Sequence, residues 1–504
     1  EPRATGPQNS PAVAPLWPKP RARGRVWIDY QNDVTAKDVE LAARENFVSV
    51  EHLKRYTTLG MATDQGKTSN LNGLALLAGI TGRRIPEVGT TTYRPPFTPV
   101  PFPSLAGSRS GSLPAPVRRL PLESRHRADA AVFQEYGGWL RPAHYGGAGA
   151  DARAAIQEEA RRARQTVALF DGSTLGKIEV IGPRAAEFVD FIYYNTMSTL
   201  KPGRCRYGFM LSENGVVFDD GILVRLDEHR FVVSCSSSHV VAVHARLEEW
   251  RQDRFGRDAV YIHNATADLA TLTVSGPGAR GLMEALDLGL ALDDESLPHM
   301  AIGDGRFAGE AVRVARVSFT GDRSYEVSIR ADRAEKLWAR MKEAGAAFEA
   351  VTIGLEALMI LRAEKGYIVI GKDTDGTTMP HDLGVGGPRL KRPGEFVGRR
   401  SLFTEEGERA DRNQLVGLTV AEGEEPLPVG AHGIERQGDG KRSIGFVTSS
   451  YWSPTLNRPV ALALIERGAA RHGETIELQH LGMLRRATIA PPCAFDPAGD
   501  RLNA

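Results

Sequence analysis

Apolar residues recur at helical spacing in some segments and at alternate positions in others, and this pattern predicts the elements of the fold. Near the N-terminus, the capping-box pair Thr35 and Asp38 precedes a periodic apolar run that starts at Val39, so we expect a helix to begin there. The pattern predicts another helix over residues 71–78. Residues 55–70 between them are rich in hydroxyls and glycine, and we expect a loop.

From residue 121 onward, strand and helix patterns are mixed. Strands are predicted over 206–211, 215–226 and 230–234, with turns at 213–215 and 227–229, and helices over about 240–250 and 333–344. One pattern occurs twice, 94 residues apart: 178–189 and 272–283 each consist of a short strand, a Gly-Pro turn and an amphipathic helix. This order of helices and partly antiparallel strands predicts an α+β fold rather than a doubly wound parallel sheet.

Proline-rich segments divide the chain into expected domains. Six of the first 20 residues are proline, and residues 93–121 contain eight more, which disfavours helices and paired strands in both places. Because the chain starts at Glu1 rather than Met, its first residues are expected to be a linker exposed by truncation or processing. We therefore expect a linker (1–25), a small helical domain (26–92), a proline-rich linker (93–120), an α+β domain (121–404) and, after a polar loop, a C-terminal domain (412–504).

Composition excludes several classes of function. The 504 residues include 63 Lys and Arg against 62 Asp and Glu, and a net charge of +1 gives no field to attract nucleic acid or an anionic membrane. The three cysteines lie too far apart for a metal site, so we expect no metal and a reducing compartment. The longest apolar stretch, 73–80, is far below the roughly 20 residues that a bilayer requires. These features predict a soluble, cytoplasmic protein.

No standard catalytic signature occurs in the sequence, but three polar clusters interrupt apolar segments. Asp219 and Asp220 lie in a predicted strand, so one of them must face inward; alternatively both bond backbone at a bulge. Glu326 follows a tyrosine in another strand, where a solvated hairpin face is the alternative. Arg362 and Glu364 end an apolar helix, where they could equally be ion pairs at a helix cap.

In this order and spacing, the clusters match a known family. The chain resembles the C-terminal half of the alpha subunits of heterotetrameric sarcosine oxidases, and from about Leu120 it is similar to the aminomethyltransferase (T-protein) of the glycine cleavage system. Residues 26–74 are similar to the oxidase subunit alone. The shared motifs are 170–178, 203–211, 217–221, 361–371 and 448–456. There are two departures: Gly172 replaces a usual valine, and residues 386–388 replace a tryptophan-containing segment.

The resemblance implies a folate-binding aminomethyltransferase-like body with a C-terminal β-barrel, preceded by the small helical domain. It assigns acid–base work on the folate nitrogen to Asp219, or to Asp220 if the register differs by one. Glu326 is expected to pair with the amino-pyrimidine edge of the pterin. The other expected folate-binding residues are Tyr207 and Tyr367 along the pterin, Arg362 for the glutamate tail, and Trp452, with Tyr451, closing the pocket.

The resemblance also implies flavin cofactors and partner subunits. FMN is expected where alpha meets beta, FAD in the beta subunit, and NAD in an N-terminal domain of alpha that we expect to be missing here. Candidate FMN contacts in the polar loop are Arg55, Thr58, Gln65 and Lys67, although the loop could contact protein alone. Expected partners are the beta, gamma and delta subunits and the N-terminal half of alpha, with no nucleic acid and no membrane.

The activity implied is the second half of a sarcosine oxidase reaction. Tetrahydrofolate captures the methylene iminium made by flavin oxidation and gives 5,10-methylenetetrahydrofolate and glycine, while the complex releases hydrogen peroxide. Two alternatives stay open at this point. The same scaffold could serve another N-methyl substrate, such as N-methylglutamate or dimethylglycine, in an oxidase or dehydrogenase, or it could be a non-catalytic assembly subunit.

Overall fold

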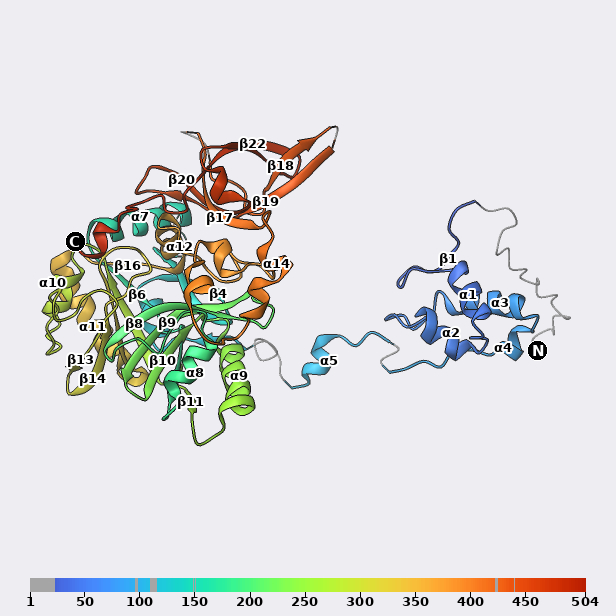
Figure 1. Cartoon of the computed structure of the whole chain (residues 1–504), viewed down its shortest axis with the longest axis horizontal. Coiled ribbons are helices and arrows are strands. Elements are labelled where there is room, and N and C mark those ends of the chain that lie inside the picture. The colour runs from blue at the N-terminus through green and yellow to red at the C-terminus, as the bar shows by residue number, and fades with distance from the viewer. Residues whose placement is uncertain are drawn as a thin grey trace, which may run out of the picture. The chain divides into compact units, whose positions relative to one another are not determined.

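The computed structural model describes residues 23–95, 98–108, 116–147, 149, 151–421, 425–438 and 440–504. The chain forms two compact units, Glu1–Pro116 and Val117–Ala504 (Figure 1). Most of the expected linker over 1–25, and residues 96–97 and 109–115 of the second expected linker, lie outside the described residues.

The first unit is small and largely helical. Its elements are β1 (Trp27–Asp29), β2 (Val34–Thr35), α1 (Ala36–Arg44), α2 (Val50–Thr57), α3 (Asn70–Thr81), α4 (Ile85–Val88) and α5 (Phe102–Ala106). The predicted capping box is confirmed, because Thr35 N donates to Asp38 Oδ2 at 2.7 Å at the start of α1. The loop prediction was wrong at its beginning: residues 55–57 continue α2, whose basic last turn suits the negative end of the helix dipole.

The second unit contains two mainly antiparallel sheets. The five-stranded sheet has the order β11-β7-β10-β9-β8, and the six-stranded sheet the order β13-β14-β15-β12-β6-β16. Their strands are β6 (Ala168–Asp171), β7 (Gly176–Ile181), β8 (Arg204–Leu211), β9 (Val217–Asp227), β10 (Arg230–Cys235), β11 (Tyr261–Asn264), β12 (Leu269–Ser275), β13 (Ile302–Phe307), β14 (Glu310–Ala315), β15 (Ser324–Arg330) and β16 (Val351–Thr352). The three strands predicted over 206–234 are confirmed as β8, β9 and β10.

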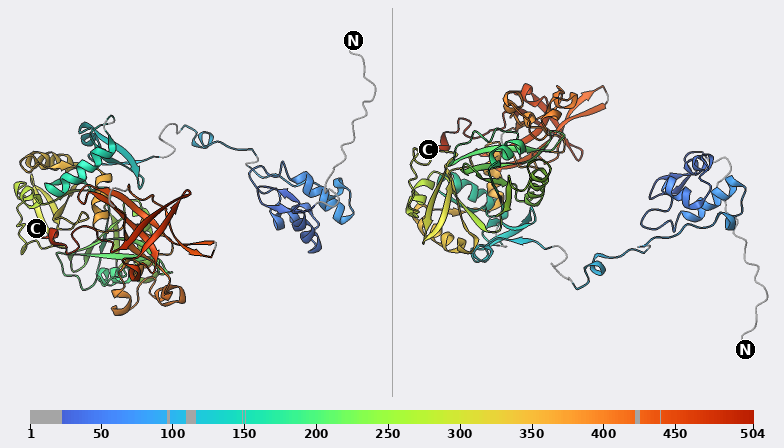
Figure 2. Two further views of the ribbon diagram at one scale, coloured as in Figure 1. Left: turned by 90° about the horizontal axis from the view of Figure 1, so that it is seen from above. Right: turned by 60° about the horizontal axis from the view of Figure 1, so that its bottom comes forward.

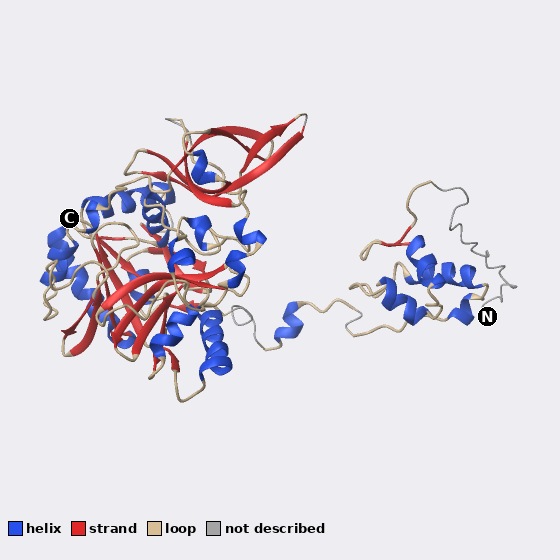
Figure 3. Cartoon of the chain, viewed as in Figure 1, coloured by secondary structure: helices blue, strands red, loops and turns tan. Residues whose placement is uncertain are grey.

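Helices cover one face of each sheet (Figure 3). α8 (Ala185–Ile192) and α9 (Val240–Trp250) pack against the five-stranded sheet, in a core that includes Phe188 and Phe231. α10 (Ala279–Ala285) and α11 (Ala334–Gly345) pack against the six-stranded sheet, around Trp338 and Val327. The residues predicted for α9 match the observed helix. Because each sheet buries one face under its own helices, the opposite faces are left to meet each other.

The predicted duplication is confirmed. β7 with α8 and β12 with α10 are corresponding strand-turn-helix units, one in each sheet. Their turns require glycine: Gly182 and Gly276 have φ of +141° and +121°. A Cβ atom would lie 2.4 Å from the Ala259 carbonyl oxygen at the first turn and 2.6 Å from that of Thr166 at the second. The repeated Gly-Pro motif therefore marks a close backbone approach.

A small sheet, further helices and a barrel complete the unit. They are β3 (Arg118–Arg119), β4 (Ala131–Tyr136), β5 (Trp139–Tyr145), α6 (Glu123–Ala128), α7 (Ala152–Gln165), α12 (Leu355–Glu364), α13 (Gly387–Lys391), α14 (Glu405–Glu408) and the barrel strands β17 (Asn413–Thr419), β18 (His432–Gln437), β19 (Gly440–Ser453), β20 (Arg458–Glu466), β21 (Thr475–His480) and β22 (Met483–Ala490). These C-terminal strands form a closed barrel, drawn in orange and red in Figure 2. Their order around it is β17-β20-β19-β18-β21-β22. The α+β class and the C-terminal barrel are thus confirmed.

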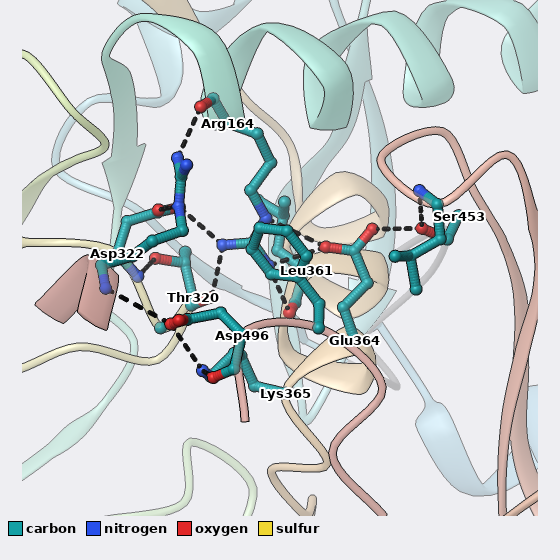
Figure 4. Close-up of polar contacts among 12 residues, drawn as sticks. Arg164, Thr320, Asp322, Leu361, Glu364, Lys365, Ser453 and Asp496 are labelled. Atoms are coloured by element: carbon teal, nitrogen blue, oxygen red, sulfur yellow. Dashed lines mark hydrogen bonds and ion pairs between the residues drawn. The ribbon is translucent and has the colours of Figure 1, made fainter. Parts of the chain in front are cut away.

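After the barrel, the chain returns to helix α12 and its surroundings (Figure 4). Asp496 accepts a 3.1 Å ion pair from Lys365, and the backbone N–H of Ala494 donates to the Glu364 carbonyl at 2.9 Å. Nearby, the buried Arg164 pairs with Asp322 at 2.5 Å and with the Glu364 carboxylate at 2.7 Å. The segment after β22 is therefore joined to the body through buried polar contacts.

No helix within the described ranges combines the length and the apolarity that crossing a bilayer requires.

Candidate functional site

A cavity of about 60 Å³ lies between the inner faces of the two sheets. Its lining includes Lys177 of β7, Ile222 and Val224 of β9, Thr271 of β12 and Glu326 of β15. Ligand pockets usually measure roughly 300–1,000 Å³. A ligand of folate size bound here must therefore extend beyond the cavity, along the faces of the sheets.

Glu326 is the cavity residue with the clearest chemical potential. Among the described residues, no hydrogen bond or ion pair reaches its carboxylate, although a carboxylate can accept several. Burial raises the pKa of Glu326 to about 7, and the positive charge of Lys177 opposes that rise. The side chain is therefore poised between its neutral and ionised forms, with its acceptors available to a ligand.

Lys177 contributes a buried amine to the same cavity, a residue that sequence reasoning missed. Its Nζ donates to the carbonyl oxygens of Ser173 at 3.0 Å and Leu175 at 2.9 Å. Burial lowers the pKa of Lys177 to about 8, while Asp171 and Glu326 act in the opposite direction. The signal for it was present in the sequence, since an isolated lysine begins the apolar strand of the 170–178 motif.

Asp219 and Asp220 lie on opposite faces of β9. Asp220 shares its face with Ile222 and Val224, which line the cavity, because alternate residues of a strand point the same way. The Tyr207 hydroxyl donates to Asp220 at 2.6 Å from the neighbouring strand. Asp219 is fully buried on the other face, where its Oδ2 accepts a 3.0 Å hydrogen bond from the Ser236 backbone. The residue first expected to do the acid–base work therefore points away from the cavity.

The two aspartates also differ in electrostatics. Burial raises the pKa of Asp220 to about 7; the negative charge of Asp219 adds to this, whereas the hydrogen bond from Tyr207 opposes it. The pKa of Asp219 is also raised by burial, against hydrogen bonds from Ser236 and the charge of His239, whose Nδ1 lies 3.8 Å from Asp219 Oδ1. At neutral pH, Asp220 is thus suited to both accepting and donating a proton.

Arg362 does not occupy the place expected of a residue that binds a ligand's tail. Its side chain is fully buried and forms a 2.5 Å ion pair with Asp373. It also donates to the Ser449 hydroxyl at 2.7 Å and to the Tyr367 carbonyl at 2.9 Å. The guanidinium has no exposed surface for a carboxylate, so this expectation is corrected: Arg362 holds α12, the following loop and β19 together.

An aromatic cluster packs against helix α12. Tyr136, Phe170, Phe319 and Tyr451 pack around one face of α12, and Tyr367 stacks on Phe319 with ring centroids 6.3 Å apart. Tyr367 is therefore at the edge of this cluster. Trp452 follows Tyr451 in β19 and points to the opposite face of that strand, so the structure brings Tyr451 rather than Trp452 toward Phe170.

The candidate flavin contacts in the first unit do not converge on a preformed site. Arg55 pairs with Glu51 on its own helix at 2.9 Å. The Thr58 hydroxyl donates to the Thr57 carbonyl at 2.5 Å, and Gln65 bonds Ala62 through its amide nitrogen at 3.2 Å. Lys67 forms contacts of its own. Arg55, Thr58 and Gln65 therefore already use polar atoms within the unit.

No group of three or more His, Cys, Asp or Glu side chains in the described part of the chain is arranged to hold a metal ion.

Three family models match successive parts of the chain. The sarcosine oxidase A3 domain matches residues 23–109, the GCVT N-terminal domain matches 122–387, and the glycine cleavage T-protein C-terminal barrel domain matches 413–496. The middle model covers more than half of the chain and contains the whole inter-sheet cavity.

Similarities to individual proteins agree with these family matches. The sarcosine oxidase subunit alpha of Corynebacterium sp. strain P-1 is 38% identical over 99% of this chain and 53% of its own length, so the chain spans about half of that relative. The Streptomyces coelicolor aminomethyltransferase is 34% identical over 71% of this chain and 91% of its own. The crystal structure of aminomethyltransferase T from Bartonella henselae covers 76% of this chain and 99% of its own, at 25% identity and a TM-score of 0.65.

Proposed function

This chain belongs to the glycine cleavage T-protein family, and we propose that it binds tetrahydrofolate between its two sheets and transfers a one-carbon unit to it. The observation that carries the proposal is the carboxylate of Glu326, which lines the cavity without a partner among the described residues. A pterin presents two adjacent N–H donors, and a carboxylate can accept both at once. Binding such an edge would compensate the acceptors that folding leaves unused.

Asp220 is proposed as the acid–base group, in place of Asp219. It faces the cavity side of β9, and its pKa of about 7 lets it accept a proton from a folate nitrogen and return one to a leaving amine. The hydrogen bond from Tyr207 fixes the orientation of its carboxylate. In this scheme, N5 of tetrahydrofolate attacks the methylene carbon of an iminium, the amine leaves protonated, and N10 closes the ring as it loses its proton.

The similarity to sarcosine oxidase subunits supports a proposal for where the transferred carbon comes from. We propose that the iminium comes from flavin oxidation of an N-methyl amino acid, sarcosine in the first instance, by a partner subunit. The products are then 5,10-methylenetetrahydrofolate and glycine. The first unit, which matches the sarcosine oxidase A3 domain, is proposed to contact the flavin-bearing partner.

Titration calorimetry with tetrahydrofolate tests the proposal on the purified chain. We expect saturable binding by the wild type. Glu326→Gln should weaken this binding by about 1–3 kcal/mol, because the uncharged amide oxygen is a weaker acceptor than a carboxylate and the amide NH₂ group would face an N–H donor of the pterin. Glu335→Gln is the matched control, since Glu335 of α11 is an exposed glutamate that pairs with Arg125 of α6. Equal binding by all three proteins, or no binding by a folded wild-type chain, would contradict the site.

A further inference from the structure

Strand β5 carries a buried arginine to which the proposed function gives no role. Arg141 is only 6% exposed. Its guanidinium forms no hydrogen bond or ion pair with any residue that the structure describes. It lies over the ring of Phe170, whose centroid is 5.7 Å from Cζ. Burial lowers the pKa of Arg141 to about 10, so it remains positively charged at neutral pH.

The carboxylate that acts on the pKa of Arg141 already has hydrogen-bonding partners of its own. Asp171 raises the pKa of Arg141 through its charge, but its Oδ1 accepts a 2.9 Å hydrogen bond from the Ser173 backbone. Its Oδ2 lies 3.0 Å from Nε2 of His126. The Tyr136 side chain also acts on the pKa of Arg141. A buried cation is costly unless it is paired, and a guanidinium presents five donors in a fork that fits a carboxylate.

Sheet register relates Arg141 to the proposed pterin site. Glu326 of β15 lies directly across from Thr273 of β12, and Thr273 lies directly across from Phe170 of β6. Residues opposite each other on neighbouring strands share a face, and strands are about 4.8 Å apart. Phe170 therefore lies on the same sheet face as Glu326, on the order of 10 Å away, and the Arg141 guanidinium stands beside its ring.

We propose that Arg141 binds a carboxylate of the ligand held at Glu326. This assignment rests on the proposed function and adds to it the group that recognises the ligand's negative end. Tetrahydrofolate carries its glutamate carboxylates at the end opposite the pterin, beyond an aromatic p-aminobenzoyl group. An aromatic group suits the cluster of Tyr136, Phe170 and Tyr451, which contains the ring beside Arg141. The carboxylate of an amino-acid substrate has the same chemistry and is the second possible source.

The test compares tetrahydrofolate with tetrahydropteroate, which lacks the glutamate, on the full chain and on Arg141→Met. We expect the variant to lose roughly 10- to 100-fold in affinity for tetrahydrofolate and to keep its affinity for tetrahydropteroate. Equal affinities of the variant and the wild type for both folates, combined with weaker binding of glycine to the variant, would assign the carboxylate to the amino acid. Unchanged binding of all three ligands would overturn the inference.

Two further variants separate ligand binding from structure. Arg141→Lys keeps the charge without the fork and should recover part of the lost affinity. Arg118→Met is the matched control, because Arg118 also stands over a ring of the small sheet, 4.6 Å from the Trp139 centroid, but is exposed and bonds the Gly137 carbonyl. Removing an unpaired buried charge should leave the melting temperature of Arg141→Met unchanged or higher. A lower melting temperature with parallel loss for both folates would make Arg141 structural and overturn the inference.

The same experiment distinguishes failure of this inference from failure of the proposed function. Absence of tetrahydropteroate binding by the wild-type chain would remove the pterin site itself. Binding of both folates by the wild type, with unchanged affinities of Arg141→Met for both folates and for glycine, would leave the pterin site in place and remove only Arg141 from it.

Discussion

The hydroxyl of Tyr207 and the carboxylate of Asp220 are joined by a 2.6 Å hydrogen bond between adjacent strands, on the side of the sheet that lines the cavity. Asp219, one residue earlier, has no access to this side and is held by the Ser236 backbone. The pair of aspartates therefore separates into one group available for chemistry and one that is part of the core.

Replacing Asp220 by asparagine should uncouple capture of the one-carbon unit from its production. In a complex with a flavin-bearing partner, we expect flavin reduction by sarcosine to be nearly unchanged. Capture should slow by roughly 10²–10⁴-fold, because asparagine accepts no proton, and water then hydrolyses the iminium. The measurement is the ratio of formaldehyde to methylenetetrahydrofolate at saturating folate, with stopped-flow flavin reduction beside it.

Asp219→Asn is the matched control for that experiment. It should leave the product ratio close to that of the wild type, although it removes a buried carboxylate and so changes stability. A shift toward formaldehyde in Asp219→Asn but not in Asp220→Asn would return the role to Asp219.

Affinity for tetrahydrofolate should increase as the pH rises from about 6 to 8. The pKa of Glu326 in the free protein is raised to about 7, and a pterin edge that donates two hydrogen bonds favours the ionised form. Binding below pH 7 therefore releases a proton, which calorimetry in buffers of different ionisation enthalpy would detect. In Glu326→Gln the pH dependence should be much flatter; an equally steep profile would attribute the proton to Asp220.

The stability of the ligand-free protein should change with pH in the opposite direction. Glu326 has an ordinary pKa near 4.5 when unfolded and about 7 when folded, so between these values the native state holds a proton that the unfolded chain releases. This group therefore lowers the free energy of unfolding as the pH rises from 4.5 to 7. Melting temperatures of Glu326→Gln should fall less over this window than those of the wild type. Parallel curves for the two proteins would argue against the raised pKa.

Arg362→Ala should act on stability rather than on folate selectivity. Removing one partner of a buried ion pair leaves Asp373 uncompensated and typically costs about 3–5 kcal/mol. We expect a lower free energy of unfolding in denaturant titrations and equal effects on mono- and polyglutamylated folate. A selective loss of polyglutamate affinity with unchanged stability would restore the tail-binding role.

Local patterns in the sequence predicted much of the fold. Helix α9 and the strands around it follow from periodicity, and the two Gly-Pro turns follow from a repeated motif. The orientation of Asp219 and Asp220 did not follow, because alternation says only that neighbours point oppositely. Which of them faces the second sheet depends on how β9 pairs with β8 and β10.

Long-range contacts account for what sequence reasoning missed or misassigned. Arg362 was expected to bind the glutamate tail, because its partners Asp373 and Ser449 lie 11 and 87 residues further along the chain and no local pattern indicates them. No sequence pattern distinguishes Arg141, because what sets it apart is a buried guanidinium without a hydrogen-bond or ion-pair partner among the described residues. That property emerges only when β5 packs beside Phe170.

The return of the chain after the barrel has a consequence for biosynthesis. Lys365 lies at the end of α12 and is buried, yet its carboxylate partner, Asp496, is made more than a hundred residues later. A chain growing from its N-terminus can fold earlier domains while later ones are still being made. Here the two sheets can form first, but the ammonium of Lys365 has to stay hydrated until the barrel and the segment behind it have left the ribosome. Final closure around α12 therefore comes late, after the barrel strands have been made.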